Sequence, residues 1–242
     1  MNRPWDNKTV DGKPSGGVGG NVLRAAVLGA NDGLVSNLSL VMGVAGAALE
    51  ERAILITGLA GLLAGACAMA MGEWISVQSS RELYTRRIAL DARVLEENPE
   101  EETEELVVLY KAKGLPDALA RQVSDHLMMN PRQALDTMVR EELGINPDDL
   151  GGSAWEAAGA SFVLFAVGAI VPVLPFFFLV GEAAVYSSLL ASAALLIVMG
   201  MGITVLTGRN PLYSGARQLL FGMAAAGVTF AIGRLIGVTV AG

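Results

Sequence analysis

The chain has 242 residues, of which 52% are hydrophobic and only 17% charged, and its formal net charge is −7 at pH 7. Soluble domains carry about 25% charged residues, so this composition indicates a membrane protein. The acidic balance and the single cysteine exclude a basic nucleic-acid-binding surface and an intrachain disulfide, so no nucleic-acid partner is expected.

The chain begins with a polar tail, and five apolar stretches follow. Residues 1–20 are rich in Gly, Pro and Asn and lack the apolar core of a signal peptide, so we expect a disordered tail. Each apolar stretch is long enough to cross about 30 Å of hydrocarbon. The stretches are residues 23–48, 54–78, 154–179, 184–206 and 214–240. They predict an all-α protein with five transmembrane spans, the third of them kinked near its far end by Pro172 and Pro175.

An acidic insert lies between the second and third spans. Residues 81–150 hold 16 of the 24 Asp and Glu and 9 of the 17 Lys and Arg, and so carry the whole net charge. The second span is expected to continue as one long helix up to Pro99, with further helices opening at Pro99, Pro116 and Pro131. We predict a cytoplasmic bundle of three or four helices. The expected domains are the tail at 1–20, spans 1 and 2 at 21–80, the metal-binding insert at 81–150 and spans 3 to 5 at 151–242.

The basic residues outside the spans predict the orientation in the membrane. One side receives the insert, the tail and the loop between the fourth and fifth spans, and the last two contribute Arg3, Lys8, Lys13, Arg24, Arg209 and Arg217. The opposite loops offer only Arg52. Because basic loops stay in the cytosol, we expect the N-terminus and the insert to be cytoplasmic. The chain length and the lack of a targeting signal favour a bacterial inner membrane, with an organelle membrane as the alternative.

A carboxylate interrupts the first apolar stretch. Asp32 inside hydrocarbon costs roughly 3 kcal/mol on insertion scales, so such residues are usually functional. On a helix Asp32 and Ser36 share a face, and the second span has a similar polar stripe. The predicted polar path consists of Asp32, Ser36, Met69, Glu73 and Ser76. The alternative is structural: Asp32 caps a helix kink and Glu73 lies at the headgroups.

The ligand types of this path indicate its cargo. Carboxylate and hydroxyl oxygens suit hard divalent ions, whereas the thioether of Met69 suits softer ones. The combination favours Fe²⁺ or Mn²⁺ over Mg²⁺ or Ca²⁺. Met69 is equally explained as core packing, because methionine fills gaps in many cores.

The insert offers a second candidate metal site. Glu102 and Glu105 are three residues apart on one expected helix, and Met138 and Glu142 are four apart on another, with Glu141 beside them. Facing helices with such residues build carboxylate-rich sites for Fe²⁺, Mn²⁺ or Zn²⁺. The alternative is a solvated acidic face. The single histidine cannot form a histidine-based site, and no permanent cofactor is expected.

Four segments carry a resemblance to a known family. "GANDGLVSNLSLVMGVAGA" and "GLLAGACAMAMGEWISVQSSREL" resemble the first two spans of the vacuolar iron transporter family. "EELVVLYKAKGLPDALARQV" and "REELGINPDDLGGSAWEAAGASFVLFAVGAIVPVLPF" resemble its cytoplasmic metal-binding domain and third span. The resemblance covers the chain from about Asn21 and places it in the subgroup with a metal-binding domain. It implies a five-span homodimer that moves Fe²⁺, and often Mn²⁺, out of the cytosol in exchange for protons.

The same resemblance assigns residues to roles. It implies a transport path at the dimer interface with Asp32, Met69 and Glu73, and a metal-binding domain with Glu102, Glu105, Met138 and Glu142. Asp91 matches one position of a further acidic pair, and Val94 stands at the other unless Glu96 or Glu97 takes its place. The leading interpretation is therefore a divalent-metal/proton antiporter and not an enzyme. The alternatives are a membrane-anchored metal-binding or sensory protein without transport, and a ferritin-like oxidase, for which the Glu-x-x-His pairs are missing.

Overall fold

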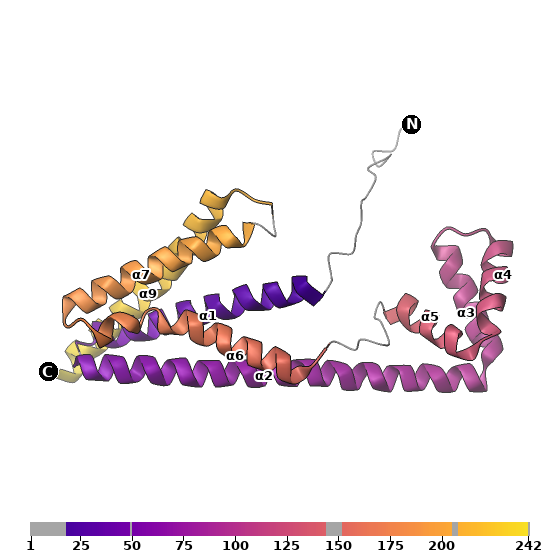
Figure 1. The fold of residues 1–242 in the computed structure, drawn as a ribbon, viewed down its shortest axis with the longest axis horizontal. Helices are drawn as coiled ribbons and strands as arrows, with labels where there is room; N and C mark the ends of the chain where they lie inside the picture. Colours follow the sequence, from indigo (N-terminus) through magenta and orange to yellow (C-terminus); the bar gives the residue numbers. More distant parts are fainter. Residues whose placement is uncertain (1–17, 49, 144–151, 205–207, 242) are drawn as a thin grey trace. The chain divides into compact units, whose positions relative to one another are not determined.

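The computed structural model describes residues 18–48, 50–143, 152–204 and 208–241, and within these the chain is all-helical, as the sequence predicts (Figure 1). The elements are α1 (Val18–Gly46), α2 (Glu51–Glu97), α3 (Pro99–Ala112), α4 (Asp117–Met128), α5 (Pro131–Leu143), α6 (Ala154–Ile170), the 3₁₀ turn η1 (Leu174–Phe177), α7 (Glu182–Gly202) and α9 (Pro211–Ala241). The expected disordered tail lies outside the described residues up to residue 17, and residues 18–20 already belong to α1.

Two compact units make up the chain. The membrane unit comprises Met1–Gly72 and Ala157–Gly242, and the insert unit comprises Glu73–Glu156. The 47-residue helix α2 is continuous and belongs to the membrane unit up to Gly72 and to the insert unit from Glu73 onward. Each unit contains its own cluster of buried hydrophobic residues, so each is stabilised by its own packing.

Prolines open the helices of the insert unit where the sequence predicts it. α2 ends at Glu97, and α3 begins at Pro99, because proline has no N–H to donate inside a helix but fits its first turn. α5 begins at Pro131, and α4 begins directly after Pro116. The expected long extension of the second span and the three helices after it are thus confirmed as helices.

The third apolar stretch differs from its prediction. We expected a kinked span over 154–179. In the structure α6 ends at Ile170, and the short 3₁₀ turn η1 follows it. Pro172 cannot donate a hydrogen bond, so the N–H of Val171 turns to Gly168 O, and that of Val173 turns to Ile170 O. The two prolines therefore end the helix instead of bending it.

Side chains from other helices bond the carbonyl groups at this helix end. The Asn37 amide of α1 donates to Ala169 O at 2.7 Å, and the Ser188 hydroxyl of α7 donates to Pro172 O at 2.7 Å. Both donors are buried. Backbone polar groups at membrane depth need such partners, because hydrocarbon supplies none.

Three of the described helices are long and apolar enough to cross a membrane. They are α2, α7 and the Pro211–Val238 part of α9. α6 is apolar but has only 17 residues, and α1 has 29 residues and includes Asp32 and Asn37. The expectation of a helical membrane protein is confirmed at this level, and the number of spans remains a prediction.

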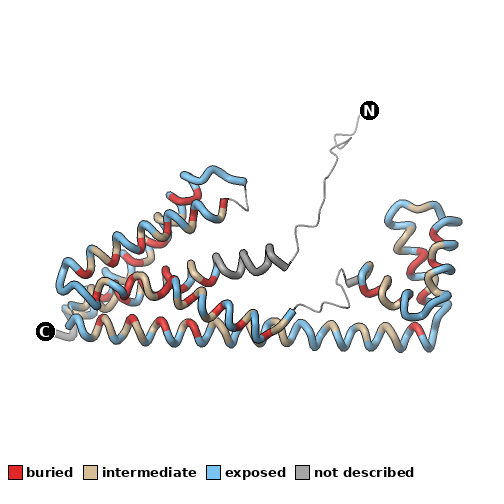
Figure 2. The backbone as a smooth tube through the Cα atoms, viewed as in Figure 1, coloured by how far each residue is buried: buried red, intermediate tan, exposed pale blue. Residues whose placement is uncertain are grey.

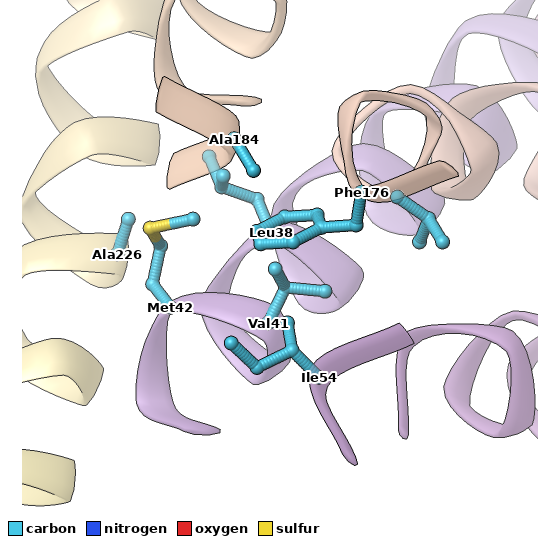
Figure 3. Close-up of a cluster of buried hydrophobic side chains, with 8 residues drawn as sticks. Leu38, Val41, Met42, Ile54, Phe176, Ala184 and Ala226 are labelled. Carbon is cyan, nitrogen blue, oxygen red and sulfur yellow. The ribbon is translucent and has the colours of Figure 1, made fainter. Parts of the chain in front are cut away.

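α1 is packed against α2, α6, α7 and α9 within the membrane unit. Its residues Leu38, Val41 and Met42 form one buried cluster with side chains of neighbouring elements (Figure 3). The partners in this cluster are Ile54, Val173, Phe176, Ala184 and Ala226. The backbones also come close: a Cβ at Gly33 would lie 2.2 Å from Phe165 O of α6. Only glycine permits this approach between α1 and α6.

The insert unit has a smaller core. Leu95 of α2, Leu106 of α3, and Ala134 and Met138 of α5 are buried together, while the opposite faces of these helices are exposed (Figure 2). α4 packs against α3 and α5. The insert is therefore a helical bundle whose acidic residues divide between the buried and exposed faces.

Candidate functional site

Asp32 lies on the exposed face of α1. Leu28, Asp32, Ser36 and Leu40 follow one another at steps of four residues and are all exposed. Leu34, between them in sequence, is fully buried. The Ser36 hydroxyl donates to the main-chain oxygen of Asp32 at 2.5 Å, which occupies the hydroxyl within its own helix. The carboxylate therefore lies on the outer surface of the membrane unit, beside the exposed Leu28, Ser36 and Leu40.

Met69 of α2 lies against α1 at Gly29. Its methyl carbon is 3.5 Å from the position that a Cβ on Gly29 would take, and Gly29 is three residues before Asp32 on α1. The rest of the Met69 side chain packs against the buried cluster of Leu62, Ala66, Phe165 and Ala169. The packing of Met69 in this core is observed, and its role as a metal ligand stays a prediction.

Glu73 and Ser76 continue the same face of α2 beyond Met69. They follow Met69 by four and seven residues on an unbroken helix, and they belong to the insert unit. Glu73 is half-buried and Ser76 is exposed. Next to Glu73, the Trp74 ring lies 5.7 Å from the ring of Trp155, which was not anticipated from the sequence. Tryptophan is enriched at membrane–water boundaries.

Three of the predicted metal ligands of the insert point toward its interior. Glu102 is 6% exposed and Met138 is 2% exposed, the latter inside the bundle core. Asp91 is half-buried, and its Oδ2 is buried without a hydrogen-bond partner among the described residues. Burial raises the pKa of Asp91, while the nearby Arg87 guanidinium opposes the rise. A carboxylate in this state gains from any cation that approaches it.

The remaining predicted ligands lie elsewhere. Glu105 is exposed, Glu141 forms an ion pair with Lys113, and the side chain of Glu142 lies outside the described residues. Over the part of the chain that the structure describes, no three His, Cys, Asp or Glu side chains are grouped closely enough to hold a metal ion. The predicted six-residue site is therefore divided into an inner and an outer set.

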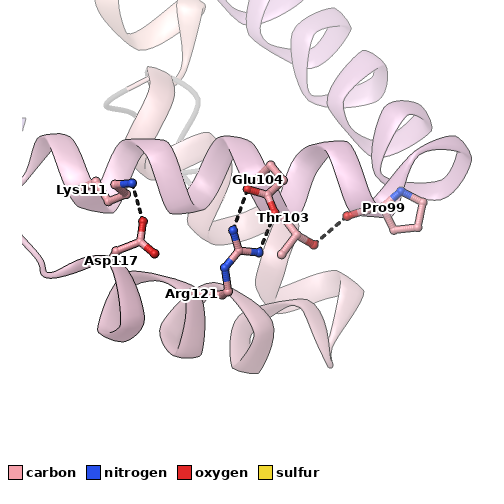
Figure 4. Close-up of polar contacts among 6 residues, drawn as sticks. All are labelled: Pro99, Thr103, Glu104, Lys111, Asp117 and Arg121. Atoms are coloured by element: carbon pink, nitrogen blue, oxygen red, sulfur yellow. Dashed lines mark hydrogen bonds and ion pairs between the residues drawn. The ribbon is translucent and has the colours of Figure 1, made fainter.

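Ion pairs between α3 and α4 use part of the acidic run that sequence reasoning left undivided (Figure 4). The Arg121 guanidinium donates to both carboxylate oxygens of Glu104, at 2.6 and 3.1 Å, and Lys111 pairs with Asp117. These bonds hold the pKa values of Glu104 and Asp117 below their usual range. They fix the α3–α4 hairpin and leave Glu102 and Glu105 to other roles.

The hairpin is expected to loosen in acid. A lowered carboxyl pKa contributes stability that is complete above about pH 5 and is lost as the pH falls below about 4. Glu104→Gln should therefore speed amide hydrogen exchange in α3 and α4 of the full chain at pH 7, and the difference from wild type should vanish near pH 3.

The control for this measurement is Glu105→Gln, which removes the same charge from the next residue of α3. It should leave exchange close to wild type, because Glu105 is exposed and Arg121 bonds Glu104. Equal effects of the two substitutions would show that net charge, and not the Glu104–Arg121 pair, holds the hairpin.

Sequence reasoning missed the amides that fix α1. Asn37 donates to Gly58 O of α2 and Ala169 O of α6, and Gln218 of α9 donates to the side-chain oxygen of Asn31. The sequence does show polar residues such as Asn37 within an apolar run, but this pattern does not identify the helix to which they bond.

Comparison with known proteins gives consistent matches. The sequence profile of the VIT family matches residues 23–234. The chain is 36% identical over 216 residues to vacuolar iron transporter homolog 5 of Oryza sativa subsp. japonica, covering 89% of this chain and 80% of that protein. It is 32% identical to vacuolar iron transporter homolog 1 of Arabidopsis thaliana, covering 89% and 83%. It is 28% identical to vacuolar iron transporter 1 of Tulipa gesneriana, covering 89% and 87%.

Proposed function

The chain belongs to the VIT family, and on that premise we propose that it carries ferrous iron out of the cytosol in exchange for protons. Proteins of this family are transporters and not enzymes, and the relatives are named for vacuolar iron transport. The observation that carries the proposal is the Asp32 carboxylate, exposed on α1 beside the helix that contributes Met69.

Five spans and a homodimer are part of the proposal. α1 and α6 join the three clear membrane helices, and the insert and the N-terminus then lie in the cytosol. Asp32 and Ser36 cannot face lipid without a large cost, because a carboxylate in hydrocarbon costs several kcal/mol. A second copy of α1 against this face would remove both residues from lipid and enclose a polar path between the two protomers.

Asp32 explains both transported species in this mechanism. As a carboxylate it binds a partly dehydrated divalent ion, and when protonated it releases that ion. Metal and proton then compete for one group, which couples their movements in opposite directions. Glu73 and Ser76, farther along α2, would receive the ion before it reaches Asp32, with Ser36 as a neutral oxygen beside it.

The proposed cargo is Fe²⁺, with Mn²⁺ as a second substrate. The Met69 thioether favours borderline transition metals over Mg²⁺ and Ca²⁺, while the oxygen ligands accept either of the two proposed ions. The relatives' names mention iron alone. Whether the membrane belongs to a cell or an organelle, the proposed direction is away from the cytosol.

The insert is proposed to capture metal on the cytosolic side. The inner set of Asp91, Glu102 and Met138 offers two carboxylates and a thioether, and the outer set of Glu105, Glu141 and Glu142 would complete the site around Fe²⁺, Mn²⁺ or Zn²⁺. Lys113 must then release Glu141, since the two are paired in the described structure. A metal-binding or sensory protein with inert spans is the second candidate, favoured only by the burial of Glu102 and Met138.

Asp32→Asn is the sharpest test of the transport path. It keeps the volume and hydrogen-bonding capacity of the side chain but removes the charge that binds a divalent ion. We expect Fe²⁺ flux into proteoliposomes to fall at least about tenfold, which corresponds to about 1.4 kcal/mol. Folding and dimerisation should persist, because the substitution removes a charge from hydrocarbon.

Glu73→Gln and Met69→Ala serve as graded comparisons in the same assay. Both should lose less flux than Asp32→Asn, because Glu73 lies nearer water and Met69 is a neutral ligand. Near-normal flux in Asp32→Asn at matched protein levels would return Asp32 to a structural role and favour the sensory alternative.

Replacing Glu102, Glu105 and Glu142 together with Gln tests the insert. We expect the full-length triple variant to bind Mn²⁺ at least about tenfold more weakly than wild type in equilibrium dialysis, since three oxygen ligands lose their charge. The matched control replaces Glu100, Glu101 and Asp125, three exposed residues, with their amides and removes the same charge. Equal weakening in both variants would show that the acidic run is only a solvated face.

A further inference from the structure

Asn37 is a buried polar residue within the membrane unit. It is 2% exposed, and its Nδ2 donates to two carbonyl oxygens on different helices, Gly58 O of α2 at 3.1 Å and Ala169 O of α6 at 2.7 Å. Both N–H groups of the carboxamide are thereby used. One side chain of α1 thus joins three helices.

The other end of the same carboxamide has no partner. Asn37 Oδ1 is buried without a hydrogen bond among the described residues, and a Cβ on Gly61 would lie 2.7 Å from it. Leaving a buried carbonyl oxygen unbonded opposes folding. Asn37 therefore stabilises the fold less than its two donated bonds suggest. The direction of those bonds shows instead how α1 is oriented.

The two bonds fix the rotation of α1 about its own axis. Asn37 follows Asp32 by five residues, which places the two side chains about 140° apart around a helix at 100° per residue. With Asn37 held between α2 and α6, Asp32 lies on a different side of α1, which is the exposed one. The bond from Gln218 of α9 to Asn31 acts on the same turn as Asp32 and opposes the same rotation.

We propose that Asn37 is a positioning residue for Asp32. Its carboxamide sets the orientation of α1, and so directs the Asp32 carboxylate toward the path where the metal ion passes. The proposal rests on the proposed function for its effect on transport, and on the structure alone for its effect on the orientation of α1.

The orientation is tested by thiol labelling in proteoliposomes. Single cysteines replace Ser36, which is exposed, and Leu38, which is buried, in a chain with the native Cys67→Ser. With Asn37 present, N-ethylmaleimide should label position 36 at least about tenfold faster than position 38. Asn37→Leu, which has a similar volume and no donors, should reduce this ratio at least about threefold.

Transport kinetics supply the second readout. If Asp32 is misdirected, the apparent KM for Fe²⁺ should rise at least about threefold in Asn37→Leu. A purely structural loss would lower the amount of active protein and the maximal rate, with KM unchanged. Ser188→Ala is the matched control: it removes a bond between a buried side chain and Pro172 O, but it lies on α7. It should change neither KM nor the labelling ratio.

Gly61→Ala is the second variant if Asn37→Leu does not fold. Its added methyl group crowds Leu40 Cδ2 and Asn37 Oδ1, both on α1, without removing the amide, and it should change KM and the labelling ratio in the same direction. An unchanged labelling ratio in whichever variant folds would overturn the proposal. If wild type moves no Fe²⁺, the proposed function fails, while the labelling ratio still decides whether Asn37 orients α1.

Discussion

Polar groups at membrane depth must find partners within the protein, and this requirement organises the membrane unit. Where Pro172 and Pro175 end α6, Asn37 and Ser188 bond the carbonyl groups of that helix end. These bonds tie α6 to α1 and α7, as the proposed placement of α6 in hydrocarbon requires. Asp32 is the contrasting case, since its side chain remains exposed on the protomer. The proposed function assigns the binding of the transported ion to this exposed carboxylate.

Close packing around α1 decides which of its faces stays exposed. Gly33 permits contact with the backbone of α6, and Gly233 of α9 approaches Gly43 in the same way, with a Cβ there 1.9 Å from Gly43 O. α1 is thus fixed by neighbours on several sides, and its exposed face consists of residues 28, 32, 36 and 40. The contacts that stabilise the membrane unit therefore also set the direction of the Asp32 carboxylate. This explains how a residue that is unfavourable in an apolar surface can keep a defined direction.

The sequence predicts local features well and contacts between helices poorly. Apolar length and proline positions predict the helices, including the starts at Pro99 and Pro131, because these depend on neighbouring residues alone. The sequence predicted a kink at the end of α6. The helix ends there instead because Asn37 and Ser188 bond its carbonyl groups, and both residues belong to distant segments that the local sequence does not reveal. The acidic run could not be divided for the same reason: Glu104 pairs with Arg121 of another helix, while Glu102 is buried. Asp32 stays a prediction, made because a carboxylate in an apolar run is costly wherever it lies.

Coupling of metal and proton at one carboxylate is the central claim, and uptake of radioactive ferrous iron into proteoliposomes measures it most directly. The vesicles contain the wild-type chain and a pH-sensitive dye, and the pH gradient is either imposed or collapsed by an ionophore. The mechanism predicts iron accumulation against its gradient only while the interior is acidic, with the interior becoming more alkaline as iron enters. Accumulation that is equal with and without the pH gradient, and that leaves the interior pH unchanged, would contradict it.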